Sequence, residues 1–408
     1  PYYWCVDKDG NQLPFIDTIT YTTVQDPEVM KLSFQQGKVD FVLTSHTPIT
    51  IADYAGLKQS EQRSGLEVRF WDSGSGSASA IFFNLDHKDE AMRKLVREAK
   101  FRQALSHAYN RKDVQKSVYY NTGELTTGTL SPKGYNFNIN AEARRRYVEW
   151  RDSYVEYNPD KAKRMLDELG LKDRDGDGFR EMPDGSKLTV TLDYHADAAR
   201  EHVSKNNLLA RDWKAVGINA KPNPVPPTAF SDRWTSGQLL TNSDWGIGDN
   251  NPLIYPGWVV PVSSEHWAPL HGQWFTLRGT PAEKQQLNVD PWKRQPPRIG
   301  PLDKQDFYQP AQRLWQLYDA ARVETDTLQR TKLIWDIFRV HVQQGPYITG
   351  VVANFPRAVL VRRGLKNVPT SADLKKYALG GWTDPWIIPC PAVYDPETFY
   401  YEDPSAHA

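Results

Sequence analysis

The sequence predicts an α/β protein. Segments in which apolar residues recur every three or four positions alternate with short apolar runs, as expected for helices that pack against buried strands. The chain has 408 residues, which is enough for two or three domains. No repeat of fixed period and no low-complexity segment interrupts this alternation.

The first elements are predicted from capping residues and periodicity. Asp26 is typical of an N-cap and is followed by proline at the first helical position, so we expect a helix that ends near Gly37. Short apolar runs predict strands over 39–43 and 80–85. A helix is expected over 101–111, where apolar residues fall at i, i+3, i+4 and i+7.

The middle of the chain continues the same pattern. Asn158, followed by proline, begins a helix that Gly170 ends. A strand is expected over 188–194, a helix over 199–216, and a further strand directly after it.

Residues 221–303 break the alternation, since they are rich in Pro and Trp and only weakly periodic. So long an irregular stretch in a compact protein is usually functional. Helices are then expected over 307–322 and 328–342, and a strand over 347–354.

Composition excludes several classes of function. The 50 basic and 50 acidic residues balance, so there is no positive excess for nucleic acid. No apolar run reaches the roughly 20 residues of a membrane helix. We found no zinc-protease, nucleophile-elbow or phosphate-loop motif, and 73–79, rich in Ser and Gly, lacks the third glycine of a dinucleotide fingerprint.

Residues 173–184 resemble a calcium-binding loop. Asp173, Asp175 and Asp177 stand at positions one, three and five, and glycine stands at position six. Phe179 would offer its backbone carbonyl at position seven, and Asp184 stands at position twelve, where glutamate is usual. The pattern is compatible with a structural Ca²⁺ ion, and it favours a metal-free Asp/Gly turn.

Several segments resemble the family 5 extracellular solute-binding proteins, the receptors of peptide and oligosaccharide ABC importers. The N-terminal Tyr-Trp followed by Gly-Asn-Gln-Leu-Pro, the stretch 101–111 (F-R-Q-A-L-S-H-A-Y-N-R), and the step Y-N-P-D-K-A over 157–162 stand in the order found in that family. The resemblance extends over nearly the whole chain.

This resemblance implies a two-lobed, type II periplasmic-binding-protein-like fold whose lobes are joined by crossing strands. Residues 1–80 and 353–408 would form part of the first lobe, and 81–352 the second lobe with hinge strands at its ends. It also implies that an N-terminal portion of the family fold is absent from this chain, so the first lobe should expose an apolar surface or an unpaired strand edge.

Candidate ligand contacts come from the 14 tryptophans, many of which sit beside Gly, Pro, Asn or Asp. Loop tryptophans can stack on a ligand or fill irregular packing. The candidates are Trp71, Trp245, Trp258, Trp267 and Trp274. By resemblance, Asp249 corresponds to the aspartate that pairs with a peptide amino group, although its loop is shorter here, and Asn250 lies beside it.

The resemblance therefore implies capture of an oligosaccharide or an oligopeptide in an inter-lobe cleft for transport, with no chemistry and no required cofactor. The aromatic residues favour the sugar. Implied partners are ABC permease subunits in the membrane. The protein would be a monomer in the periplasm or anchored outside the cell. A carboxylate-based glycoside hydrolase and a signalling protein on the same fold are the alternatives. Cys5 and Cys390 either form a disulfide or stay unpaired.

Overall fold

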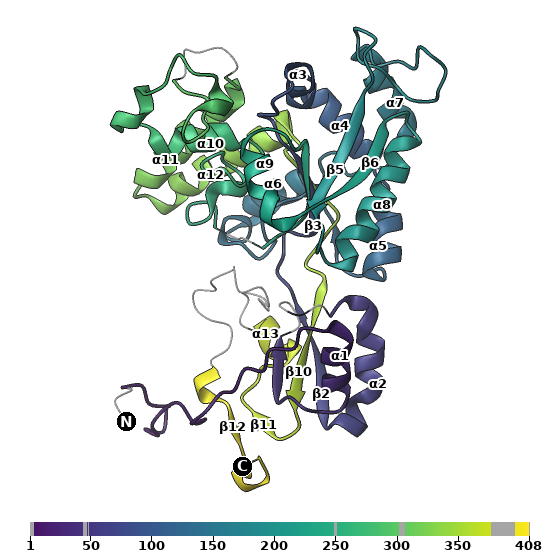
Figure 1. Cartoon of the computed structure of the whole chain (residues 1–408). Helices are drawn as coiled ribbons and strands as arrows, with labels where there is room; N and C mark the ends of the chain where they lie inside the picture. Colours follow the sequence, from purple (N-terminus) through teal and green to yellow (C-terminus); the bar gives the residue numbers. More distant parts are fainter. Residues whose placement is uncertain are drawn as a thin grey trace. The chain divides into compact units, whose positions relative to one another are not determined.

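The computed structural model describes residues 4–43, 47, 49–248, 251–301, 307–376 and 396–407. The chain divides into two compact units, each drawn in Figure 1. The first unit comprises Pro1–Gly74 and Asn354–Ala408, and the second comprises Ser75–Ala353. The expected boundaries at 80/81 and 352/353 lie close to these positions. Cys390 lies outside the described residues, so its pairing with Cys5 stays a prediction.

The first unit contains a three-stranded antiparallel sheet in the order β1-β10-β2. Its central strand, β10 (Pro356–Arg362), comes from the far end of the chain and pairs with β1 (Phe41–Leu43) and β2 (Leu66–Asp72). A second, two-stranded sheet joins β11 (Leu365–Lys366) to β12 (Tyr400–Tyr401).

Alternate residues of β10 supply two cores on opposite faces of the sheet. Ala358 and Leu360 pack with α1 (Pro27–Gln35) and α2 (Tyr54–Ser64), which lie on the same side of β10 in Figure 1. Val359 and Val361 face a second cluster. The predicted N-cap is confirmed, because the Asp26 carboxylate accepts a hydrogen bond from the Glu28 amide at 2.8 Å.

Within the first unit, large apolar side chains are exposed on α1 and in the segment before it, among them Ile19, Tyr21 and Leu32. The strands β1 and β2 are the edges of the three-stranded sheet. Whether a further segment covers these features stays a prediction.

The described residues of the second unit form three small sheets. In the first, β3 (Ser77–Phe83) lies between β7 (Thr241–Ile247) and β8 (Ile348–Gly350). In the second, β5 (Thr189–His195) and β6 (Asn219–Val225) are parallel. In the third, β4 (Glu124–Leu125) pairs with β9 (Val352–Ala353).

Side chains join β5 to β7 in place of a backbone ladder. The Asp193 carboxylate accepts hydrogen bonds from the amides of Leu240 at 2.9 Å and Thr241 at 3.0 Å. The His195 amide donates to the Asp244 carboxylate at 2.6 Å. These bonds extend the β3 sheet toward the parallel pair.

The helices expected over 158–170, 199–216, 307–322 and 328–342 are confirmed with shifts of a few residues. Helices surround the sheets of the second unit (Figure 1). They are α3 (Glu90–Arg97), α4 (Ala99–His107), α5 (Arg111–Tyr119), α6 (Ala141–Asp152), α7 (Pro159–Glu168), α8 (Arg200–Lys214), α9 (Pro227–Thr235), α10 (Pro269–Leu277), α11 (Gln309–Val323) and α12 (Thr327–Gln344). The short helix α13 (Ser371–Lys376) belongs to the first unit. The 3-10 turns are η2 (Ile51–Asp53), η3 (Tyr135–Phe137), η4 (Pro256–Trp258), η5 (Pro281–Lys284), η6 (Pro291–Lys293), η7 (Pro396–Thr398) and η8 (Pro404–His407).

Two sequence expectations need correction. The stretch 101–111 is not one helix: α4 ends at His107, and Asn110 then caps α5 by accepting a hydrogen bond from the Asp113 amide. The stretch 221–303 is not wholly irregular, since it contains α9, β7 and α10. These elements are short, and α9 buries only Phe230 and Trp234, so their periodicity is weak.

A buried carboxylate fixes the start of α10. Asp86 is inaccessible to solvent and accepts hydrogen bonds from the amides of Leu270 at 2.9 Å and His271 at 3.1 Å. It also accepts from the His271 ring at 2.7 Å and lies 2.8 Å from the Arg97 guanidinium. Burial would raise the pKa of Asp86, but its interactions with His271 and Arg97 outweigh burial and keep that pKa well below its usual range.

Candidate ligand-binding surface

The candidate surface lies in the second unit where β3 and β7 run side by side. The chain passes from the first unit into the second at Ser75, two residues before β3 begins. The first residues of β3 therefore lie at the end of the strand where the chain enters this unit. Ser77 pairs with Ile247 and Ala80 pairs with Trp245. Register shifts between these pairs make the ladder irregular at this end.

An aromatic cluster covers one part of this surface. Trp245 is 37% exposed, and its ring centroid lies 5.7 Å from Trp258 and 5.9 Å from His266. Phe82 contacts both of those partners from β3. Trp258 and His266 are buried and contact the Trp245 ring in T-shaped arrangements, while Trp245 itself stays partly accessible. Burial lowers the pKa of His266 to about 4, so this support is uncharged at neutral pH.

A buried lysine lies beside the same strands. The Lys205 ammonium, from α8, donates hydrogen bonds to the Ser243 carbonyl at 2.7 Å and to the Ser243 hydroxyl at 2.8 Å. Its side chain is fully buried, and loss of hydration lowers the pKa of Lys205 to about 7, although the Asp244 charge opposes the shift. Strongly perturbed groups of this kind are enriched at functional sites.

The neighbouring Asp244 carboxylate is also buried. One oxygen accepts hydrogen bonds from the His195 amide and from the His195 ring, the latter at 2.7 Å. The other oxygen is buried and has no hydrogen-bond partner among the described residues. The His195 ring stacks on Phe230, with centroids 4.1 Å apart.

The last three residues of the Ser/Gly run, Ser77–Ser79, belong to β3. Ser77 and Ser79 are buried in β3, and the Ser79 hydroxyl lies 2.9 Å from the His202 ring nitrogen. A Cβ atom on Gly76 would approach the Thr129 carbonyl oxygen to 1.9 Å. Small residues are therefore required here because two backbone segments pass close together.

Four of the five tryptophan candidates are core residues. Trp267 is fully buried and stacks on Tyr347, with ring centroids 4.4 Å apart. Trp274 packs on Trp315 at 5.0 Å. Trp71 is fully buried in the first unit and donates a hydrogen bond to the Pro369 carbonyl at 3.1 Å.

Trp258 is also buried, behind Trp245, as described above. These four rings are enclosed by their own unit, and a ligand contact for any of the five candidates stays a prediction. Trp245 alone of the five is exposed. Asp249 and Asn250 lie outside the described residues, so their assignment stays a prediction.

The polar residues of this surface were not predicted from the sequence. Lys205 has the same helical spacing as Leu209 and Trp213, which are buried, so its place on the inner face of α8 was readable from the sequence. The sequence around His195 and around Asp244 contains no motif that indicates a functional role, because their contact joins two segments about fifty residues apart.

The acidic hairpin, defined as residues 173–187, gathers three of its predicted ligands. Carboxylate oxygens of Asp173, Asp175, Asp177 and Glu181 all lie within 4.8 Å of one another. Asp184 is not part of this group, because its carboxylate accepts hydrogen bonds from the Ser186 amide and hydroxyl. Glu181, at position nine of the loop, takes the place expected for Asp184.

The backbone of Phe179 takes part in the hydrogen bonds of the hairpin. Its amide donates a hydrogen bond to the Asp177 carboxylate at 2.8 Å. A role for its carbonyl stays a prediction.

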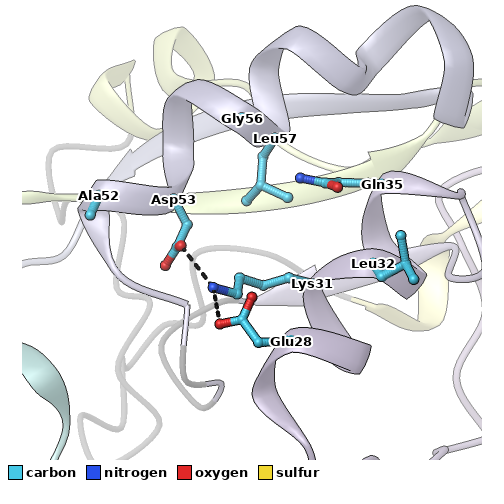
Figure 2. Close-up of a pocket in the computed structure, with 8 residues that line it drawn as sticks. All are labelled: Glu28, Lys31, Leu32, Gln35, Ala52, Asp53, Gly56 and Leu57. Atoms are coloured by element: carbon cyan, nitrogen blue, oxygen red, sulfur yellow. Dashed lines mark hydrogen bonds and ion pairs between the residues drawn. The ribbon is translucent and has the colours of Figure 1, made fainter.

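A pocket of about 370 Å³ lies in the first unit (Figure 2). It is lined by α1 and by the segment from η2 to α2, and Lys31 crosses it to the carboxylates of Glu28 at 2.6 Å and Asp53 at 3.3 Å. The ion pairs neutralise its one lysine. The pocket contains none of the predicted ligand contacts, and we assign it no function.

The fold is that of the two-lobed periplasmic binding proteins. The structure of an oligopeptide-binding protein OppA matches 98% of this chain and 59% of its own length, with a TM-score of 0.67 and 25% identity. AppA from Bacillus subtilis in complex with a nonapeptide has a TM-score of 0.62 and 19% identity over 96% of this chain and 61% of its own. MelB from Agrobacterium fabrum C58 in complex with stachyose has a TM-score of 0.61 and 20% identity over 91% of this chain and 51% of its own.

The chain belongs to the bacterial extracellular solute-binding proteins, family 5, whose profile matches residues 1–260. Among curated relatives, the oligopeptide-binding protein AppA of Bacillus subtilis (strain 168) is 28% identical over 54% of this chain and 36% of its own length. A periplasmic alpha-galactoside-binding protein of Rhizobium meliloti (strain 1021) is 28% identical over 48% of this chain and 29% of its own. The chain thus spans about a third of the length of these relatives.

Within the described residues, no helix combines the length and the apolar character needed to cross a membrane.

Proposed function

We propose that this chain takes part in capturing an oligosaccharide or an oligopeptide for an ABC importer. Membership of the family supports a binding protein as the class of function. Relatives with peptide-binding and galactoside-binding names are found at similar identity, which supports both ligand classes. The protein would work outside the cytoplasmic membrane as a monomer, pass its ligand to membrane permease subunits, and perform no chemistry.

The observation that carries the proposal is the exposed ring of Trp245. Its ring makes T-shaped contacts with the buried Trp258 and His266, so little conformational freedom is lost when a ligand stacks on it. Pyranose rings present C–H surfaces that suit an indole face. We therefore favour an oligosaccharide, and the oligopeptide is the second candidate because of the predicted role of Asp249.

The test is calorimetric titration of the full-length protein with α-linked and β-linked oligosaccharides and with mixed tripeptides. Trp245→Ala should weaken sugar binding by about 1–3 kcal/mol, as for other well-packed aromatic anchors. Trp245→Phe should retain part of the affinity because a ring remains. Tyr157→Ala serves as a matched control, since Tyr157 is an exposed aromatic residue of the same unit outside the candidate surface.

Tight peptide binding that is lost in Asp249→Ala and unaffected by Trp245→Ala would overturn the sugar preference and leave the transport receptor in place. Hydrolysis of an oligosaccharide by the purified protein would instead support the glycosidase alternative. If neither ligand class binds, the receptor proposal itself fails for this chain.

A further inference from the structure

We infer that the acidic hairpin binds a Ca²⁺ ion through the carboxylates of Asp173, Asp175, Asp177 and Glu181. The four side chains come from one short loop between α7 and β5, and their oxygens lie within 4.8 Å of one another. This inference concerns a site away from the candidate ligand-binding surface and does not depend on the proposed function.

Glu181 is the residue that points to a bound cation, because a cluster of exposed aspartates alone would not indicate one. Its side chain is 97% buried, at 3% relative exposure. One of its oxygens accepts a hydrogen bond from the Arg174 amide at 2.7 Å, and the other is buried with no hydrogen-bond partner among the described residues. An unsatisfied buried carboxylate oxygen is costly, and a cation at the cluster would remove that cost.

The nearby arginine does not neutralise Glu181. The Arg174 guanidinium donates to the carbonyls of Met182 at 2.9 Å and Gly170 at 3.0 Å. The buried negative charge therefore faces the aspartates, and a cation is the group that satisfies all four carboxylates together.

The chemistry of the ligands favours Ca²⁺. Oxygen ligands at positions one, three, five and nine follow the spacing of a calcium loop, and Gly176 at position six has the positive φ of 78° that the sharp turn needs. Calcium accepts six to eight oxygens in flexible geometry, so water and backbone carbonyls can complete its shell. Magnesium demands a near-ideal octahedron and keeps most of its water, so it suits this exposed loop less well.

Lys187 occupies the position of a competing cation. Its ammonium lies 2.7 Å from the Asp175 carboxylate and 2.8 Å from the Asp177 carboxylate. In the metal-free hairpin this ion pair balances part of the negative charge. Calcium and the ammonium cannot share those oxygens fully, so Lys187 must swing away when the ion enters.

The bound ion would stabilise the connection between α7 and the parallel strands. Arg180, next to Glu181, donates hydrogen bonds to the carbonyls of Val216 at 2.8 Å and Leu171 at 2.6 Å. The hairpin is thereby joined to the residues that follow α7 and to the segment that leads into β6. Its closure by calcium should raise the thermal stability of the second unit.

The test is calorimetric titration of CaCl₂ into the chelator-treated full chain, with MgCl₂ titrated in parallel. We expect one Ca²⁺ per chain with a dissociation constant of about 1 mM or tighter, and weaker binding of Mg²⁺. Glu181→Gln should weaken calcium binding at least about tenfold, because it removes a charged ligand. Asp175→Asn tests the same site through an exposed residue whose replacement leaves the core untouched.

Two further variants make the outcome specific. Lys187→Met should tighten calcium binding about two- to fivefold, the scale of an exposed ion pair that no longer competes. Asp184→Asn should leave the affinity unchanged, because Asp184 is not a ligand. No calcium heat in the wild-type chain, or binding that survives Asp175→Asn and Glu181→Gln unchanged, would overturn the inference.

Discussion

Replacing the buried Lys205 by methionine should change how the stability of the second unit depends on pH. In the folded protein the pKa of Lys205 is lowered to about 7, whereas in the unfolded chain it is near 10.5. Between these values the unfolded chain holds a proton that the folded protein has released. The free energy of unfolding of the wild type therefore rises with pH through this window.

The magnitude follows from one pKa unit being worth about 1.4 kcal/mol. At pH 7 the burial of Lys205 costs about 4 kcal/mol relative to an unperturbed lysine, and at pH 9 about 2 kcal/mol. Lys205→Met removes this titration. The stability of the variant relative to wild type should therefore fall by about 2 kcal/mol between pH 7 and pH 9.

Urea unfolding followed by tryptophan fluorescence at pH 7, 8 and 9 provides the measurement, since most of the fourteen tryptophans lie in the second unit. The absolute effect of the substitution also includes the loss of hydrogen bonds to Ser243, but that loss does not vary with pH. Lys214→Met, in an exposed position of the same helix, is the control. The same pH dependence in Lys205→Met and wild type would refute the reasoning.

Two further predictions concern the second unit. Burial lowers the pKa of His341 to about 4, below its usual 6.5, so the unfolded chain takes up a proton at higher pH than the folded protein does. The free energy of unfolding should therefore fall as the pH drops from 6.5 toward 4, by about 1.4 kcal/mol per pH unit. His341→Gln retains a donor for the Val259 carbonyl, which lies 2.9 Å from the His341 ring, but does not titrate. In urea unfolding at pH 6.5 and 5, the stability of this variant should depend less on pH than that of the wild type. An unchanged pH dependence would contradict the role of His341. Asp86→Asn should destabilise the unit by about 3 kcal/mol at pH 7, because it leaves Arg97 and His271 without their buried anion. A loss below about 1 kcal/mol in the same assay would show that the Asp86 network is not a major source of stability.

Elements with their own local signals were predictable from the sequence. Asp26 and Asn158 cap helices by accepting backbone hydrogen bonds, as their positions before proline indicated. The boundary of β3 was less accurate, because Ser77 and Ser79 have no strand preference. They are held in the strand by a close backbone approach and by contacts to distant residues.

The candidate surface was harder to predict than the fold. A tryptophan beside Gly or Pro looks the same whether its ring is enclosed, as in Trp267, or accessible, as in Trp245. The difference is set by neighbours far along the chain, such as Tyr347. In the acidic hairpin the spacing identified three aspartates, but the choice of Glu181 over Asp184 depends on which side chain turns inward.

The position of β10 in the first unit has a consequence for synthesis on the ribosome. The strand that separates β1 from β2 is translated after the entire second unit, so β1 and β2 leave the ribosome without the partner that joins them. The second unit is one uninterrupted segment and can fold while translation continues. Until residues 356–362 emerge, Leu66 and Val68 of β2 have no β10 residues to pack beside. During this interval the apolar face of β2 lacks the strand that adjoins it in the folded unit.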